Sequence, residues 1–214
     1  MHKSLTIFNT NIYLNAFIMK KTFIILILLG HALTTTAQDT QKNNLQNSSI
    51  EQSIFGIQTG FAGFWLHNEL RLSNQIALRT ELGLDAYDND DFYPDTGFLL
   101  ATVLTVEPRW YYNLNKRKSQ SKSITGNSGN FFSLKSSLRL EDLLIEFGDD
   151  EDVKMVNNFS IIPTWGIRRI LGKHFNYEAG AGIGYIHFFA KDAGFSKDKG
   201  EVAINLHLRI GYWF

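Results

Sequence analysis

The sequence predicts an all-β protein, a closed antiparallel eight-stranded transmembrane β-barrel that is preceded by a cleaved signal peptide. Three observations lead to this prediction. A basic and apolar segment near the start has the pattern of an export signal, most of the remaining chain alternates between apolar and polar residues, and the last residues form an apolar face that ends on an aromatic residue. Alternation with a period of two is expected of strands that have lipid on one side and a polar interior on the other.

Residues 19–37 have the three parts of a secretory signal. Met19–Lys21 make a short basic start, Phe23–Leu33 are almost wholly apolar, and small residues stand at Thr35 and Ala37, the two positions that a signal peptidase reads. This pattern predicts export with cleavage after Ala37. The apolar run is too short for a membrane-spanning helix, which needs about 20 residues.

The segments on either side of the signal are assigned from their composition. Residues 1–18 precede a complete signal, so we expect Met19 to be the true start and 1–18 to be a mis-assigned extension; a genuine N-terminal anchor helix is the alternative. Residues 38–52 are polar and lack apolar periodicity, which predicts a flexible periplasmic leader. Residues 53–214 are then the outer-membrane β-barrel.

Composition excludes several classes of protein. Lys plus Arg and Asp plus Glu each number 21, and no basic face stands out, so we expect no nucleic-acid partner. The chain has no cysteine, which excludes disulfides, thiolate metal sites and cysteine nucleophiles. It is rich in aromatic residues, with 17 Phe, 8 Tyr and 4 Trp, and it has only 3 Pro. This mixture favours strands and suits a membrane interface.

The alternation is clearest in residues 75–87. Successive side chains of a strand point to opposite sides, so this segment has one apolar face and one charged face. In a soluble β-sandwich the apolar face would be the core, whereas in a membrane barrel it would contact lipid. The apolar face comprises Ile76, Leu78, Thr80, Leu82 and Leu84, and the other face comprises Ala77, Arg79, Glu81, Gly83 and Asp85.

Eight segments alternate in this way, and an even number returns both ends of a barrel to the same side of the membrane. Several exceed the five or six residues that are usual in soluble strands, and they suit tilted strands of about ten residues. This length, together with the signal peptide, favours the membrane barrel over the sandwich. The segments are Ser53–Ala62, Phe64–Leu72, Gln75–Tyr87, Phe98–Asn113, Asn127–Leu138, Asn158–Ile170, His174–Phe189 and Val202–Phe214.

The connections between the segments also differ in length. Residues 73–74 and 171–173 are tight turns, while 88–97, 139–157 and 190–201 are long and polar. Outer-membrane barrels have short periplasmic turns and longer external loops, so we expect the three long connections outside. The short connection at Gly63 and the long connection over 114–126 do not follow this rule.

The end of the chain has a pattern of its own. Alternate residues from Leu206 to Phe214 form one apolar face with a terminal aromatic residue. We interpret Ile210, Tyr212 and Phe214 as a signal for assembly. The expected partners are therefore outer-membrane lipid and the barrel-assembly machinery.

The opposite faces of the strands are predicted to line the interior with charge. Glutamate and arginine suit such a place, because bidentate pairs satisfy both partners, whereas an unpaired charge is costly. We favour a structural network of ion pairs; a catalytic or conducting site with perturbed groups is the alternative. The residues concerned are Glu69, Arg71, Arg79, Glu81, Glu107, Arg109, Arg168, Glu178 and Arg209.

Catalytic and metal-binding patterns are weak. Some small membrane barrels modify lipids with a serine and a histidine, and His187 and Ser196 are the pair to consider, but their spacing does not support a triad. Residues 141–152 are rich in acids, yet they lack the ordered spacing of a Ca²⁺ loop. We therefore predict no catalytic residue, no metal site and no cofactor.

The whole of residues 53–214 resembles the small uncharacterised β-barrel families of Gram-negative outer membranes. The resemblance depends on NELRLSNQIALRTELGL, EPRWYYNLNKR, PTWGIRRILGKHFNYEAGAGIGY and the closing LRIGYWF. It implies an OmpA/OmpX-like barrel, similar to the eight-stranded adhesion, integrity and small-porin barrels, with specificity in the outer loops. No functional residue can be carried over, because these families share no catalytic motif that matches this chain.

These observations together predict a non-enzymatic barrel of the outer membrane. Its expected role is envelope integrity or surface interaction through the external loops. A narrow passive pore is the alternative, and a lipid-modifying enzyme is a second one. The surface partner is not identified by the sequence.

Overall fold

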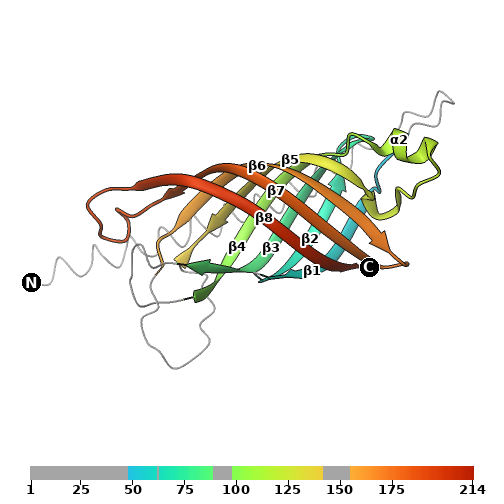
Figure 1. Cartoon of the computed structure of the whole chain (residues 1–214). Helices are drawn as coiled ribbons and strands as arrows, with labels where there is room; N and C mark the ends of the chain where they lie inside the picture. The colour runs from blue at the N-terminus through green and yellow to red at the C-terminus, as the bar shows by residue number, and fades with distance from the viewer. Residues whose placement is uncertain (1–47, 62, 89–97, 142–154) are drawn as a thin grey trace, which may run out of the picture. The chain divides into compact units, whose positions relative to one another are not determined.

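The computed structural model describes residues 48–61, 63–88, 98–141 and 155–214 (Figure 1). Eight antiparallel strands pair in chain order, and the last pairs with the first, so the sheet closes into a barrel. This confirms the predicted all-β, closed, eight-stranded class. The expected extension over 1–18 and the expected signal over 19–37 lie outside the described residues.

The eight strands follow the segments predicted from alternation, and no boundary differs by more than three residues. Turn residues limit the strands at several boundaries. Gly172 has a φ of +69°, a left-handed conformation that glycine adopts readily, and it lies in the turn between the sixth and seventh strands. The strands are β1 (Ser53–Gly60), β2 (Gly63–Arg71), β3 (Ile76–Asp88), β4 (Phe98–Trp110), β5 (Gly129–Arg139), β6 (Asn158–Leu171), β7 (Phe175–Phe188) and β8 (Lys199–Trp213).

We call the end where β2 joins β3, β4 joins β5 and β6 joins β7 the turn end, and the opposite end the loop end. At the turn end the long β4–β5 connection contains helix α2 (Leu114–Ser119) and the short 3-10 helix η1 (Thr125–Asn127) (Figure 1). Leu114 is fully buried against Tyr111 and Phe131. This connection therefore packs across the turn end instead of extending as a loop. Among the described residues, no helix is long and apolar enough to cross a membrane.

The segment just before β1 also packs at the turn end. Ile50 is 2% exposed, and its N–H donates to the carbonyl oxygen of Asn74 at 3.0 Å. The N–H of Glu51 donates to Oδ1 of Asn127 at 2.7 Å. The expectation of a flexible leader over 38–52 therefore does not hold for Ser48–Gln52, because Ile50 finds an apolar site there. The part of the leader before Ser48 lies outside the described residues.

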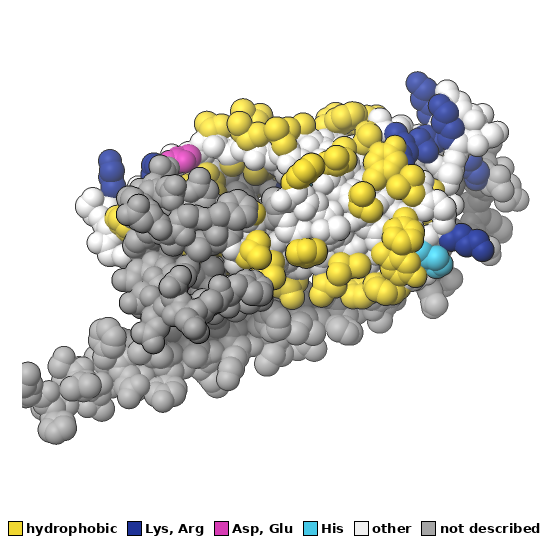
Figure 2. Space-filling view, turned by 60° about the horizontal axis from the view of Figure 1, so that its bottom comes forward, with side chains coloured by type: hydrophobic (Ala, Val, Ile, Leu, Met, Phe, Trp, Pro, Cys, Tyr) yellow, Lys and Arg dark blue, Asp and Glu magenta, His cyan; other side chains and the backbone are white. Residues whose placement is uncertain are grey.

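The alternation of the sequence places apolar side chains outside and polar ones inside. On β8, Leu206 is 76% exposed, whereas the neighbouring Asn205 is 9% exposed. Figure 2 shows the apolar side chains spread over the barrel wall. Among the large hydrophobic side chains of the strands, the largest exposed fractions belong to Phe64, Ile183, Val202, Ile204 and Leu206. The wall is thus an apolar surface around a polar interior.

The wall is not of even height. β1 pairs with β8 only from Gly56 to Gly60, opposite Trp213 to Arg209. β8 continues beyond this seam toward the loop end, as Figure 1 shows. Along Lys199–Leu208, one edge of β8 pairs with β7, and no described strand pairs with the other edge. The short β1 therefore leaves a lateral gap in the hydrogen-bonded wall.

Candidate functional site inside the barrel

The interior near the turn end holds a dense group of opposite charges. Alternate positions on β2, β3, β4, β6, β7 and β8 direct these side chains inward, and each of them is at most 4% exposed. The group, which we call the charge network, contains four glutamates and four arginines, so its formal charges balance. Its members are Glu69, Arg79, Glu81, Glu107, Arg109, Arg168, Glu178 and Arg209.

Glu178 on β7 is one centre of the charge network. Arg109 donates from Nη1 and Nη2 to both of its oxygens, at 2.9 and 2.8 Å. Arg168 donates from Nε to Oε2 of Glu178 at 2.9 Å, and from Nη1 to Oε2 of Glu69, also at 2.9 Å. The bidentate pair of Arg109 and Glu178 is among the stronger hydrogen-bonded arrangements in proteins. Two glutamates and two arginines from four strands are thereby joined.

Glu81 on β3 is the second centre. Nη1 of Arg209 donates to both of its oxygens, at 2.9 and 3.1 Å, and Nε of Arg79 donates to its Oε1 at 2.5 Å. Nη2 of Arg79 also donates to Oε1 of Gln58 at 2.6 Å. Nη1 of the same arginine lies 3.7 Å from Oε2 of Glu69, which connects the two centres. The charge network therefore extends across the barrel from β1 and β3 to β6 and β7.

Arg71 corrects the sequence prediction. It is partly exposed at the turn end, and its Nη1 donates to Oγ of Ser49 at 2.8 Å and to the carbonyl oxygen of Ile50 at 3.2 Å. Arg71 is the last residue of β2, so its side chain reaches the segment before β1 instead of the interior carboxylates. Its role in the structure is to hold Ser48–Gln52 against the barrel.

Two residues that the sequence analysis did not select complete the charge network at the turn end. The hydroxyl of Tyr111 donates to Oε1 of Glu69 at 2.9 Å, and Nδ2 of Asn127 donates to the same atom at 2.6 Å. Tyr111 lies just after β4, and burial raises the pKa of its phenol. It therefore stays neutral and donates. Tyr111 has the parity of Arg109 in the predicted segment Phe98–Asn113, and Asn127 has the parity of Phe131 in Asn127–Leu138, so alternation could have placed both inside. They were not selected because neither side chain carries a formal charge.

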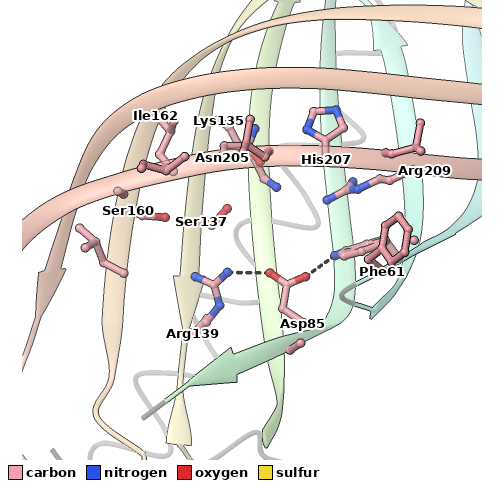
Figure 3. Close-up of a pocket in the computed structure, with 18 of the residues that line it drawn as sticks. Phe61, Asp85, Lys135, Ser137, Arg139, Ser160, Ile162, Asn205, His207 and Arg209 are labelled. Atoms are coloured by element: carbon pink, nitrogen blue, oxygen red, sulfur yellow. Dashed lines mark hydrogen bonds and ion pairs between the residues drawn. The ribbon is translucent and has the colours of Figure 1, made fainter. Parts of the chain in front are cut away.

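Toward the loop end, a cavity of about 600 Å³ lies next to the charge network. Trp65 and Arg209 lie between the cavity and the rest of the charge network. They pack against each other, with the Arg209 guanidinium carbon 3.7 Å from the centre of the indole ring. Nε1 of Trp65 donates to Oδ1 of Asp85 at 2.6 Å, and Nη2 of Arg139 donates to Oδ2 of Asp85 at 2.6 Å (Figure 3). The indole of Trp65 is buried, so this group forms a polar floor for the cavity.

Lys135 lines this cavity and was not selected from the sequence either. On β5 the inward face runs through Phe131, Ser133, Lys135, Ser137 and Arg139. The same alternation that identified the other interior charges could therefore have identified Lys135 and Arg139. The aromatic Phe131, which is fully buried on this face, makes the charged character of the strand harder to see in the sequence.

The other predicted groups lie away from the charge network. Ile210, Tyr212 and Phe214 lie on the outer face at the end of β8, where Ile210 is 55% exposed and Phe214 is 70% exposed. Nδ1 of His187 lies 3.4 Å from the Tyr185 hydroxyl, and Ser196 is exposed in the β7–β8 connection. Within the described residues, no hydrogen bond joins His187 to Ser196. Most of the acidic stretch 141–152 lies outside those residues.

No group of three or more histidine, cysteine or acidic residues in the described part of the chain could hold a metal ion. Comparison of the chain with protein-family models, with curated proteins and with solved structures finds no match in any of the three. The resemblance to small outer-membrane barrels therefore remains an expectation from the sequence.

Proposed function

We propose that this protein is an integral barrel of the outer membrane, closed inside by its charge network, with a structural role in envelope integrity or in surface interaction through its loop end. The observation that carries this proposal is the inverted distribution of polarity. Charged side chains fill the interior, and large apolar side chains cover the outside. A water-soluble barrel requires the opposite, whereas a barrel in lipid requires this arrangement.

The outer surface supports a membrane environment in more detail. Soluble monomers rarely expose contiguous apolar patches larger than a few hundred Å². Here the outer positions of β8 from Val202 to Ile210 are all apolar and at least 53% exposed. An exposed apolar surface of this kind would cause aggregation in water, whereas the hydrocarbon core of a bilayer solvates it well.

Aromatic clusters near the turn end suit the boundary between lipid and water. The ring of Trp110 lies 5.9 Å from that of Tyr112 and 6.5 Å from that of Phe132. The Tyr112 hydroxyl also accepts a hydrogen bond from Nε1 of Trp165 at 2.9 Å. Such rings favour the headgroup region and form girdles at both interfaces of membrane barrels.

The charge network supports a closed and non-enzymatic barrel. An eight-stranded barrel is just wide enough for its side chains to fill it. Glu69, Glu81 and Glu178 each accept hydrogen bonds or ion pairs from at least two arginines. Carboxylates held in this way are poor proton acceptors, because protonation would leave the buried arginines unpaired. We infer that the network keeps strands in register and blocks passage through the barrel.

The end of β8 supports the assembly role proposed for Ile210, Tyr212 and Phe214. The N–H of Phe214 donates to the carbonyl oxygen of Phe55 at 3.0 Å, and the two rings stack at 5.6 Å. The terminal residue thus lies at the seam between β1 and β8. We infer that these side chains remain accessible to the barrel-assembly machinery until the seam closes.

Cell fractionation with gel migration of heated and unheated samples tests the proposal. We expect the protein in the outer-membrane fraction, with a faster band before heating. Recovery in the soluble periplasmic fraction without a mobility shift would overturn it. In planar bilayers we expect no conductance from the purified protein, and steady channel currents would favour a narrow pore instead.

A further inference from the structure

We infer that the cavity near the loop end is a binding site for a single-chain amphiphile with an anionic head group, which enters from the lipid side through the lateral gap beside β8. Lys135 binds the head group in this inference, and the apolar lining of the gap holds the chain. The route of entry rests on the proposed membrane location, whereas the site itself rests on the geometry of the cavity.

The cavity reaches the edge of β8, which opens it sideways. Its lining includes Asn205 and His207 from the inner face of β8 and also Leu206 and Leu208 from the outer face. Both faces of one strand can border a single cavity only where the cavity passes around the strand's edge. That edge is the one that β1 leaves unpaired. The cavity and the lateral gap are therefore continuous.

The charge of the lining favours an anion. Arg139 is paired with Asp85 at 2.6 Å, and Arg209 is paired with Glu81 at 2.9 Å. Lys135 forms no ion pair or hydrogen bond with any residue in the described part of the chain. The carboxylates whose charges act on it are each already paired with an arginine; they are Glu81, Asp85 and Glu107. A partly buried ammonium group without a counter-ion is costly in an apolar environment. An anionic group in the cavity would offset that cost.

Apolar side chains line the part of the cavity that leads to the lateral gap, while Ser137, Ser160 and Asn205 add polar groups to its wall. Ile162 and Ile186 line the cavity from β6 and β7, and Val202 and Ile204 line it from β8. Phe61 stands at the tip of the β1–β2 turn, 95% exposed, at the border of the gap. The cavity volume of about 600 Å³ lies within the range of about 300–1,000 Å³ that is common for ligand pockets. An alkyl chain suits this lining, and one charged head group suits one unpaired lysine.

The neighbouring charge network limits what the site can do. Trp65 and Arg209 close the cavity on the side of the turn end. A ligand in the cavity has no open route through the interior, since the network beyond these residues is packed and paired. The site is therefore one for binding from the lipid side, not a stage of transport across the barrel.

Equilibrium binding of radiolabelled dodecanoate tests the inference. The full chain is placed in nanodiscs of zwitterionic phosphatidylcholine, and uptake by empty nanodiscs is subtracted. We expect saturable binding of one dodecanoate per barrel, and Lys135→Met should weaken it by about tenfold or more, as expected for loss of an ion pair worth about 1.5 kcal/mol. Dodecanol, which has the same chain without the charge, should bind the unchanged protein about tenfold or more weakly than dodecanoate, because the same ion pair is lost.

Three variants separate the site from general effects. Lys135→Arg keeps the cation and should retain binding within about twofold, while Ala203→Trp should fill part of the cavity and abolish binding. Lys173→Met removes an exposed cation at the turn end and should change nothing. The heat-dependent gel shift verifies that each variant is folded.

The outcomes distinguish this inference from the proposed function. Equal affinity of the unchanged protein and Lys135→Met, or equal binding of dodecanol and dodecanoate, would overturn the inference and leave the outer-membrane proposal intact. Binding by a protein that fractionates as soluble would support the site but overturn the proposed membrane location and the entry from lipid.

Discussion

Replacing Glu178 with alanine should strongly destabilise the barrel. Glu178 accepts hydrogen bonds from Arg109 and Arg168, and its Oε1 lies 3.5 Å from Nε2 of His207. Each arginine keeps another carboxylate: Arg109 keeps Glu107 and, at 3.8 Å, Glu69, and Arg168 keeps Glu69. Loss of one partner of a buried pair costs about 3–5 kcal/mol, and these remaining partners place the cost near about 3 kcal/mol.

Urea unfolding in phosphatidylcholine vesicles measures this loss. With a slope of about 2 kcal/mol per molar urea, the midpoint should fall by about 1.5 M. Glu201→Ala is the matched control, because Glu201 forms an ion pair with Lys199 in a partly exposed position. Exposed pairs contribute about 0–1 kcal/mol, so its midpoint should move little. If Glu178→Ala unfolds within about 0.3 M of this control, the charge network does not stabilise the barrel and the reasoning is refuted.

Three other changes test other parts of the molecule. Leu206→Lys should destabilise the folded barrel in vesicles by up to about 2–4 kcal/mol, measured by urea unfolding, because the proposed membrane location puts this exposed side chain in lipid; little change would indicate that this surface contacts water. Deletion of Phe214 should reduce the folded, heat-shifted protein in the outer-membrane fraction, since the aromatic end of β8 is removed, and normal insertion would contradict the assembly role. Arg71→Ala should release Ser48–Gln52 and speed proteolysis there, because two hydrogen bonds worth about 1 kcal/mol each are lost; an unchanged cleavage rate would argue against this anchor.

Alternation was sufficient to predict the strands and most of the charge network. The pleat of a strand fixes which side of the sheet each residue faces, so Arg79 and Glu81 had to share a face with Gly83 and Asp85. Once one apolar face was assigned to the outside, the inward direction of Glu107 and Glu178 followed without knowledge of any partner. These predictions needed only local information.

Features that depend on strand ends and register were not accessible in this way. Arg71 has the right parity for the interior, but its position at the end of β2 directs it to Ser49 and Ile50. The cavity arises because β1 is shorter than β8, and alternation carries no information on how far two distant strands pair. Ile50 was missed because one apolar residue in a polar segment shows no periodicity.

The narrow β1–β8 seam has a consequence for how the barrel forms and fails. It joins the first strand to the last through five residue pairs, whereas β3 and β4 share thirteen. Contacts between residues so distant in the chain are slow to form, because a long loop must be closed first. The seam should thus be the final join in folding and the first to part under mechanical load. Separation of the two strands should begin at the Gly60–Arg209 pair, because this last pair of the seam borders the unpaired part of β8.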